Sequence, residues 1–143
     1  MNTNTMTLFA NEEEESFTVD YTKELVEGSS KLNKVLIIKF SADWCKPCKI
    51  IAPYVDKRRR NMNQSHIYWG EVDIDESMDL YMFLKNKRMV SGIPTMLAWF
   101  PNPDRDQTKW YIPDDSISGT DISQVGEFFD RCFAESSKLE KNK

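Results

Sequence analysis

Residues that bind metals or form structural disulfides are scarce in this sequence. Its 143 residues include only three cysteines and one histidine. An odd and small number of cysteines argues against a secreted framework of disulfides. Zinc and iron–sulfur sites need about four ligands. Beyond Cys45 and Cys48 the chain offers only Cys132 and His66, so we expect neither a metal nor another cofactor.

Long apolar runs and an excess of positive charge are also absent. No stretch approaches the roughly 20 apolar residues of a membrane span. The start of the chain, MNTNTMTLFANEEEESF, lacks the basic and apolar parts of a signal peptide. The formal net charge of −4 gives no electrostatic reason to expect nucleic acid. We therefore predict a cytoplasmic protein that binds neither membranes nor nucleic acid.

The one basic cluster, at 57–60, falls late in a predicted helix. Cations there favour the negative end of the helix dipole, so we expect a solvated surface. A patch that binds a partner or a phosphate is the alternative.

A single domain is the natural organisation for 143 residues with 40% hydrophobic content. We place this domain at 17–135. Residues 1–16 include four consecutive glutamates and are expected to form a flexible acidic tail. The charged end, 136–143, is expected to fray after a final helix that ends near Ala134.

The apolar pattern predicts an α/β fold with one strand buried on both faces. The run KVLIIKFSA, at 34–42, is nearly unbroken in apolar and β-branched residues, which is typical of a central strand. Strands and helices alternate around it, an order that implies parallel pairing with helices on both faces. The other predicted elements are helices at 21–29, 46–62 and 77–86, strands at 66–75 and 95–100, and a last helix from Asp121 or Ser123.

One long turn interrupts this alternation. The segment PNPDRDQTK, at 101–109, holds two prolines and many polar residues. The following WYIPDDSI, at 110–117, resumes as a possible strand. We expect Trp110 and Tyr111 to cover the core from this strand, and a partner-binding surface is the alternative.

The segment ADWCKPCK, at 42–49, places Cys45 and Cys48 where the central strand ends and a helix begins. Unpaired backbone N–H groups and the helix dipole favour an anion at that end, so the Cys45 thiolate is the candidate nucleophile. Pro47 suits the first turn because its missing N–H would have no helical partner there. Cys48, one turn further on, is close enough for a disulfide and is expected to be the more buried, resolving thiol.

Other uses of the cysteines are less well supported. A disulfide across so short a loop stabilises a fold by only about 2 kcal/mol before strain, so it suits opening and closing better than stapling. Cys132 lies in an apolar helical stripe and is expected to pack in the core, with a secondary redox role as the alternative. His66 is expected to be structural or at the surface.

Two motifs far apart in the chain, FSADWCKPCKIIAP and VSGIPT, resemble the thioredoxin family over about residues 20–135. The resemblance implies a thioredoxin-like fold, with a central mixed sheet of four to five strands flanked by helices on both faces. In that family a tryptophan precedes the first cysteine, a proline separates the cysteines, and a cis Ile-Pro bond faces the disulfide across the substrate groove. Those places fall on Trp44, Pro47 and Ile93–Pro94.

Residues near the cysteines are expected to support them. A cis proline removes a donor and turns the chain, so the backbone of Ile93 should pair with an extended substrate segment. Gly92 should border the same groove. Trp44 either packs beneath the loop or forms a wall that contacts substrate. Lys46 stands where reducing thioredoxins have glycine, and its charge should stabilise the Cys45 thiolate and make the protein less reducing.

A second departure from the family is Lys39, six positions before Cys45, where catalytic members usually carry a buried acidic residue. A buried ammonium needs a partner or loses its charge. We therefore predict an ion pair with Glu71 on the neighbouring strand, and the alternative is an edge position from which Lys39 reaches water. A cationic Lys39 would favour the Cys48 thiolate, whereas a neutral one would act as a base.

The sequence thus predicts a thiol–disulfide oxidoreductase that exchanges its Cys45–Cys48 dithiol with disulfides of protein substrates. A protein reductase is the expected electron donor. The alternative is a thioredoxin-like binding or scaffold module with unreactive cysteines, which Lys39 and the insertion at 101–118 would suit. An oxidase or isomerase of the same fold is disfavoured by the missing signal peptide.

Overall fold

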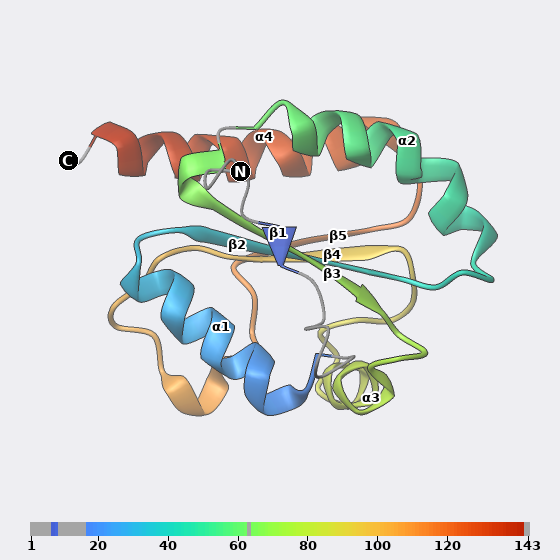
Figure 1. Cartoon of the computed structure of the whole chain (residues 1–143), viewed down its shortest axis with the longest axis horizontal. Helices are drawn as coiled ribbons and strands as arrows, with labels where there is room; N and C mark the ends of the chain where they lie inside the picture. The colour runs from blue at the N-terminus through green and yellow to red at the C-terminus, as the bar shows by residue number, and fades with distance from the viewer. Residues whose placement is uncertain (1–6, 9–16, 63, 142–143) are drawn as a thin grey trace.

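A computed structural model describes residues 7–8, 17–62 and 64–141 (Figure 1). The predicted flexible acidic tail, 1–16, lies outside the described residues except for Thr7–Leu8. The helices are α1 Val19–Lys31, α2 Lys46–Arg60, α3 Met78–Asn86 and α4 Ile122–Lys141. The strands are β1 Thr7–Leu8, β2 Val35–Ser41, β3 Ile67–Asp73, β4 Thr95–Trp99 and β5 Asp115–Ser118.

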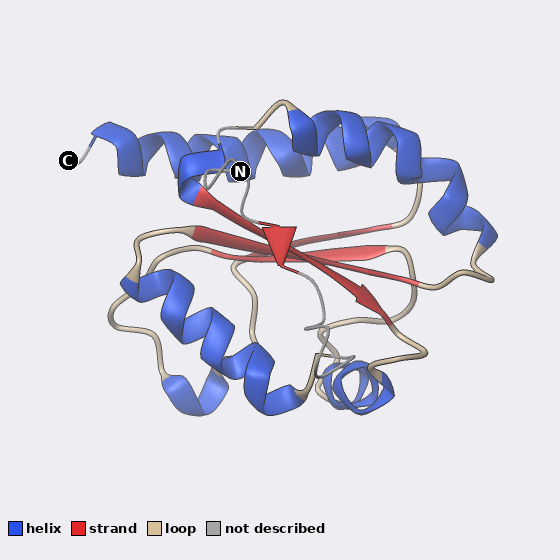
Figure 2. Ribbon diagram, in the orientation of Figure 1, coloured by secondary structure: helices blue, strands red, loops and turns tan. Residues whose placement is uncertain are grey.

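The strands form one mixed sheet in the order β1-β3-β2-β4-β5. The pairs β1–β3 and β2–β3 are parallel, and β2–β4 and β4–β5 are antiparallel. Helices α1 and α3 cover one face of the sheet, and α2 and α4 cover the other (Figures 1 and 2). The predicted central mixed sheet with helices on both faces is confirmed. Among the described residues, no helix is long and apolar enough to cross a membrane.

Strand β2 is the centre of the sheet and contributes to an apolar cluster on each face. Its side chains alternate between faces, so Leu36 and Ile38 join the cluster formed with α1 and α3. Val35 and Ile37 join the cluster formed with α2 and α4. By the same alternation Lys39 points towards α2, the helix that begins with the cysteine pair.

The final helix is longer than the sequence indicates. It continues to Lys141, so the predicted end near Ala134 and the predicted frayed tail from 136 are wrong as far as the structure describes the chain. Ser136 is buried, and Leu139 packs against the α2–α4 cluster. Leu139 lies two turns after Cys132 on the same helical face. Because the residues around Leu139 are charged, the composition of this segment does not indicate that the helix continues and packs there.

The predicted strand at 110–117 is wrong over its first half. Trp110 follows a 3-10 turn, Gln107–Lys109, and β5 starts only at Asp115. Trp110 nevertheless covers the core: it is buried, its ring stacks on Phe83 at 5.8 Å between centroids, and its carbonyl accepts the Trp99 indole N–H at 2.9 Å. The Trp110 indole is thus buried from the end of the 3-10 turn, so this residue covers the core without belonging to a strand.

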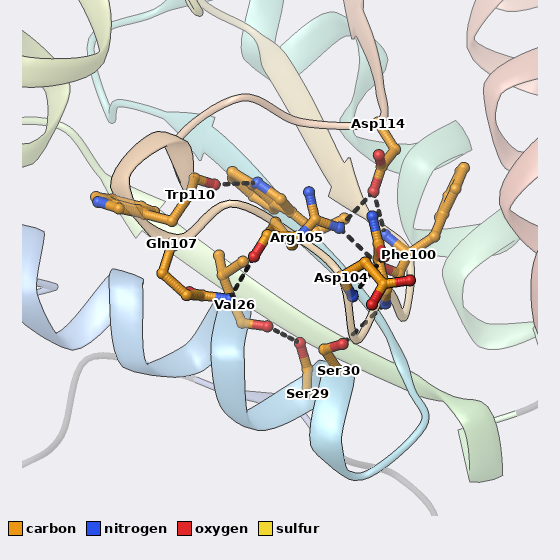
Figure 3. A network of polar contacts seen from close by, with 11 residues as sticks. Val26, Ser29, Ser30, Phe100, Asp104, Arg105, Gln107, Trp110 and Asp114 are labelled. Atoms are coloured by element: carbon orange, nitrogen blue, oxygen red, sulfur yellow. Dashed lines mark hydrogen bonds and ion pairs between the residues drawn. The ribbon is translucent and has the colours of Figure 1, made fainter.

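Polar contacts close the long segment between β4 and β5 (Figure 3). The Arg105 guanidinium donates to the Phe100 carbonyl at 2.8 Å and to Asp114 Oδ2 at 2.7 Å. The same Asp114 oxygen accepts the Phe100 N–H at 2.7 Å. Asn102 N–H donates to Ser30 Oγ at the end of α1, at 2.8 Å. The two ends of the segment are therefore tied together and to the helical layer.

Arg58 joins the two helices that cover the active-site side of the sheet. Its Nη1 donates to Tyr54 Oη at 3.1 Å and to the Gly126 carbonyl at 3.3 Å, and its Nη2 donates to Asp130 Oδ1 at 2.6 Å. Arg58 lies in the basic cluster 57–60, so this cluster is not wholly solvated as the sequence suggested. A β-carbon at Gly126 would lie 2.6 Å from Tyr54 Oη.

We therefore expect Gly126→Ala to lower the free energy of unfolding by about 1 kcal/mol, because the new methyl group displaces Tyr54 from Arg58. Gly28→Ala in α1 is the matched control, since nothing lies within 4 Å of its added carbon. There the better helix propensity of alanine should raise stability by up to about 1 kcal/mol. Urea unfolding of both variants measures the difference, and equal gains at both positions would contradict the close contact.

Candidate active site

Cys45 and Cys48 are joined in a disulfide at the amino end of α2, with 5.3 Å between their Cα atoms. Cys45 is the N-cap residue, in extended conformation, and its sulfur accepts the Cys48 N–H at 3.2 Å. Pro47 occupies the first turn of the helix, where its missing N–H leaves no donor unpaired. The Cys45 sulfur thus lies where free N–H groups and the helix dipole favour negative charge.

The burial of the two cysteines differs from the prediction. Cys45 is 3% exposed and Cys48 is 7% exposed, so Cys48 is not the more buried residue in the oxidised protein. The turn that leads into the helix covers Cys45, whose N–H donates to the Ala42 carbonyl at 3.1 Å. The distinction between an attacking and a resolving thiol therefore rests on their positions at the helix start and not on exposure.

The Ile93–Pro94 peptide bond is cis, as the resemblance implies. Pro94 lines a small cavity together with Cys48, so the two motifs that are distant in sequence meet in space. The Pro94 carbonyl accepts the Gly119 N–H at 3.0 Å, and Thr95 Oγ1 donates to the Gly92 carbonyl at 2.6 Å. These bonds fix the loop that faces the disulfide.

The rim of the site is open beside this loop. Within the described part of the chain, the backbone of Ile93 has no hydrogen-bond partner. Gly92 has no atom within 4 Å of the position its β-carbon would take. The side chain of Lys46, beside Cys45, is exposed. Space and unpaired backbone groups are therefore available next to the disulfide.

Trp44 is the exposed aromatic residue at this rim. Its side chain is not packed beneath the loop: the residue is 66% exposed. The indole N–H donates to Asp75 Oδ2 at 2.7 Å, just after the end of β3. Because a hydrogen bond holds the ring while solvent reaches it, Trp44 is placed as a surface beside Cys45.

The predicted ion pair between Lys39 and Glu71 is present, with 3.9 Å between Nζ and Oε1. The two residues are register partners on the parallel strands β2 and β3. The Lys39 side chain is only 14% exposed, so the alternative of a lysine that reaches freely into water is not what the structure has. Lys39 and Cys48 line the same cavity.

Cys132 and His66 lie apart from this arrangement. Cys132 is fully buried in the α2–α4 cluster, and burial raises the pKa of its thiol far above the usual range. His66 ends a short 3-10 turn before β3 and does not line the cavity beside Cys48. Among the described residues, no three cysteine, histidine or carboxylate side chains come together as a metal site would require.

Sequence reasoning missed two groups of supporting residues. Asp75 could have been found, because β2 and β3 are parallel and their carboxyl ends, Ser41 and Asp73, meet at one edge of the sheet. The contact between Thr95 Oγ1 and Ser118 Oγ, at 2.8 Å, had no such signal. It depends on how the insertion returns β5 to the side of β4.

Comparison with known proteins agrees with this geometry. The family model described as Thioredoxin matches residues 10–116. Thioredoxin-1 of Saccharomyces cerevisiae is 37% identical over 67 residues, which are 47% of this chain and 59% of that protein. Thioredoxin-2 of the same yeast is 32% identical over 80 residues, 56% of this chain and 67% of that protein. The chain thus spans about two thirds or less of the length of these relatives.

Solved structures show the same fold at lower identity. Thioredoxin of Schistosoma mansoni superimposes with a TM-score of 0.62 at 19% identity, covering 91% of this chain and 98% of the other. Thioredoxin of Malassezia sympodialis gives a TM-score of 0.59 at 24% identity, covering 83% and 88%. These likenesses concern the arrangement of helices and strands.

In the reduced protein we expect Cys45 to be alkylated by iodoacetamide with a pH midpoint at least about one unit below the 8.5 of free cysteine, because the helix start stabilises its thiolate. Peptide mapping after alkylation separates the three cysteines. Cys132 serves as an internal control, since its buried thiol should stay unmodified over the same pH range. A midpoint for Cys45 at or above that of free cysteine would remove the helix start from the chemistry.

Proposed function

The chain belongs to the thioredoxin family, and from this premise we propose that it is a thiol–disulfide oxidoreductase that reduces disulfides in protein substrates. One observation carries the proposal: the Cys45–Cys48 disulfide lies at the start of α2 and borders the cavity that cis-Pro94 also lines. This arrangement supports the proposal because it places the Cys45 sulfur where a helix start favours negative charge, a second sulfur within bonding distance and an open rim beside them.

In the proposed reaction the Cys45 thiolate attacks one sulfur of a client disulfide. The client S–S bond breaks, a bond forms between Cys45 and that sulfur, and the other client sulfur leaves as a thiolate that takes a proton from water. Cys48 then loses its proton and attacks the Cys45 sulfur. The second client thiolate leaves, and the two electrons that the client gains come from the dithiol.

Substrate binding is proposed at the rim described above. The free backbone groups of Ile93 would pair with an extended segment of the client, in the manner of an added strand. Trp44 would provide an apolar wall, and Gly92 the space for the client backbone. The cavity beside Cys48 is about 20 Å³, too small to enclose a small-molecule substrate, so exposed disulfides of protein clients suit this surface better.

Regeneration of the dithiol requires a reductant, and we propose a protein reductase in a reducing compartment such as the cytoplasm. Support comes from the small number of cysteines and from the single disulfide, Cys45–Cys48, among the described residues. The proposed reaction involves sulfur and protons only, and it calls on no metal or organic cofactor.

Reduction of insulin with dithiothreitol as donor tests the proposal. We expect the protein to accelerate precipitation of the insulin B chain, and Cys45→Ser to lower the rate to that of dithiothreitol alone, because no thiolate remains to attack. Cys132→Ala is the matched control, since the buried Cys132 takes no part. In a separate mixture, pre-reduced Cys48→Ser freed of dithiothreitol should accumulate a mixed disulfide with insulin that a non-reducing gel displays. A wild-type rate equal to the donor alone would favour the binding or scaffold module instead.

The charge of Lys46 should make the pair a weaker reductant. We expect Lys46→Gln to lower the reduction potential by up to roughly 30 mV, because the Cys45 thiolate loses a neighbouring cation and the reduced form is less stabilised. Lys109→Gln, which removes an exposed lysine from the distant 3-10 turn, is the control for net charge. Equilibration with glutathione buffers measures both, and an unchanged or higher potential in Lys46→Gln would contradict this role.

A further inference from the structure

Lys39 shares a cavity with the resolving cysteine, and the reaction proposed above does not use it. Lys39, in the middle of β2, lines a cavity of about 20 Å³ together with Cys48 and Pro94. A cavity of that size holds roughly one water molecule, so it is too small for substrate. The Lys39 side chain is only 14% exposed, so water screens its charge less than that of a surface lysine.

Among the described residues, no other charged side chain lines this cavity. Its remaining lining residues come from β2, α2, β4, β5, the turn before α4 and α4 itself, and all of them are uncharged. The field that the Cys48 sulfur meets from within the cavity is therefore set by Lys39.

Glu71 limits this field from the neighbouring strand. Its Oε1 lies 3.9 Å from Lys39 Nζ, and its Oε2 accepts the Trp69 indole N–H at 2.9 Å. The carboxylate is thus held in place beside the ammonium, and it does not line the cavity. Lys39 and Glu71 thus form an ion pair between neighbouring strands.

The other charged groups near the cysteine pair face solvent or other partners. On α2, Lys46 and Lys49 are exposed. Beyond Glu71, β3 carries Asp73, whose Oδ1 accepts the Asp75 N–H at 2.8 Å. At the start of α4, Asp121 is exposed and accepts the Gln124 N–H at 3.2 Å. Water screens these charges more effectively than it screens Lys39.

We propose that Lys39 is a positioning residue that stabilises the thiolate of Cys48 during resolution of the mixed disulfide, and that Glu71 moderates its effect. The inference rests on the proposed thiol exchange. In that step the Cys48 thiol gives its proton to water, and its sulfur attacks Cys45. The bond between Cys45 and the client sulfur breaks, and the client leaves as a thiolate. A cation beside Cys48 raises the fraction of thiolate at a given pH.

The resolution step can be followed without a natural client. Reduced protein treated with one equivalent of Ellman's reagent forms a mixed disulfide between Cys45 and nitrothiobenzoate. Attack by Cys48 then releases the second coloured thiolate, and stopped-flow absorbance at a series of pH values gives the midpoint of this release. Cys132→Ala is the background for all variants, so that only the active-site thiols can react.

We expect Lys39→Met to raise the pH midpoint of release by about one unit, which corresponds to roughly tenfold slower release below the midpoint. Glu71→Gln should move the midpoint in the opposite direction, because the ammonium then acts on Cys48 without its counter-charge. The double variant should behave as Lys39→Met alone. Lys49→Met removes an equal charge from the exposed face of α2 and should leave the midpoint within about 0.3 units.

Opposite shifts from Lys39→Met and Glu71→Gln support the proposal, since loss of a structural ion pair would affect both variants in the same direction. Shifts of the same sign, or no shift in Lys39→Met, overturn it. The insulin assay reports separately on the proposed function. If the protein fails to reduce insulin but the two variants still shift the midpoint in opposite directions, the proposed function is refuted and the role of Lys39 stands. If the protein reduces insulin but the midpoints do not shift, the proposed function stands and the role of Lys39 is refuted.

Discussion

The sulfur of Cys45 at the start of α2 is the interaction on which the rest of the site depends. A helix start presents backbone N–H groups without intrahelical partners, and here one of them, from Cys48, points at that sulfur. Strand β2 brings the helix start to the edge of the sheet because it is buried on both faces and cannot shift without exposing its apolar side chains. The position of Cys45 is thus fixed by the central strand of the sheet, whose apolar side chains are buried.

The residues proposed to bind a client and the residue proposed to act on Cys48 lie on different sides of this helix start. On the outer side, Asp75 holds Trp44 at the surface, and the loop before β4 leaves the backbone of Ile93 unpaired. On the inner side, Lys39 and Cys48 share a cavity closed by uncharged side chains. In the proposed reaction a client meets the outer side, so that Lys39 on the inner side would act on Cys48 without contacting the substrate.

The structural role of the insertion between β4 and β5 is clearer than any role in the recognition of a client. Its ion pair between Arg105 and Asp114 closes the segment on itself, and Trp110 is buried in the core. The segment returns the chain so that β5 pairs with β4 and Ser118 reaches Thr95. The loop that carries cis-Pro94 is therefore supported by the end of β5 and by Gly119, which follows it.

The sequence by itself determined the central strand, the helix that starts at the cysteine pair, the meeting of the two motifs and the partner of Lys39. The strand, the helix and the ion pair follow from local patterns and from the fixed register of two parallel strands, whereas the meeting of the two motifs is what the resemblance to the thioredoxin family implies. Only the tertiary structure decided the burial of Cys45, the support of Trp44 by Asp75, the turn that buries Trp110 and the length of α4. Each of these depends on contacts between segments far apart in the chain, and neither hydrophobic period nor residue spacing encodes how such segments pack together.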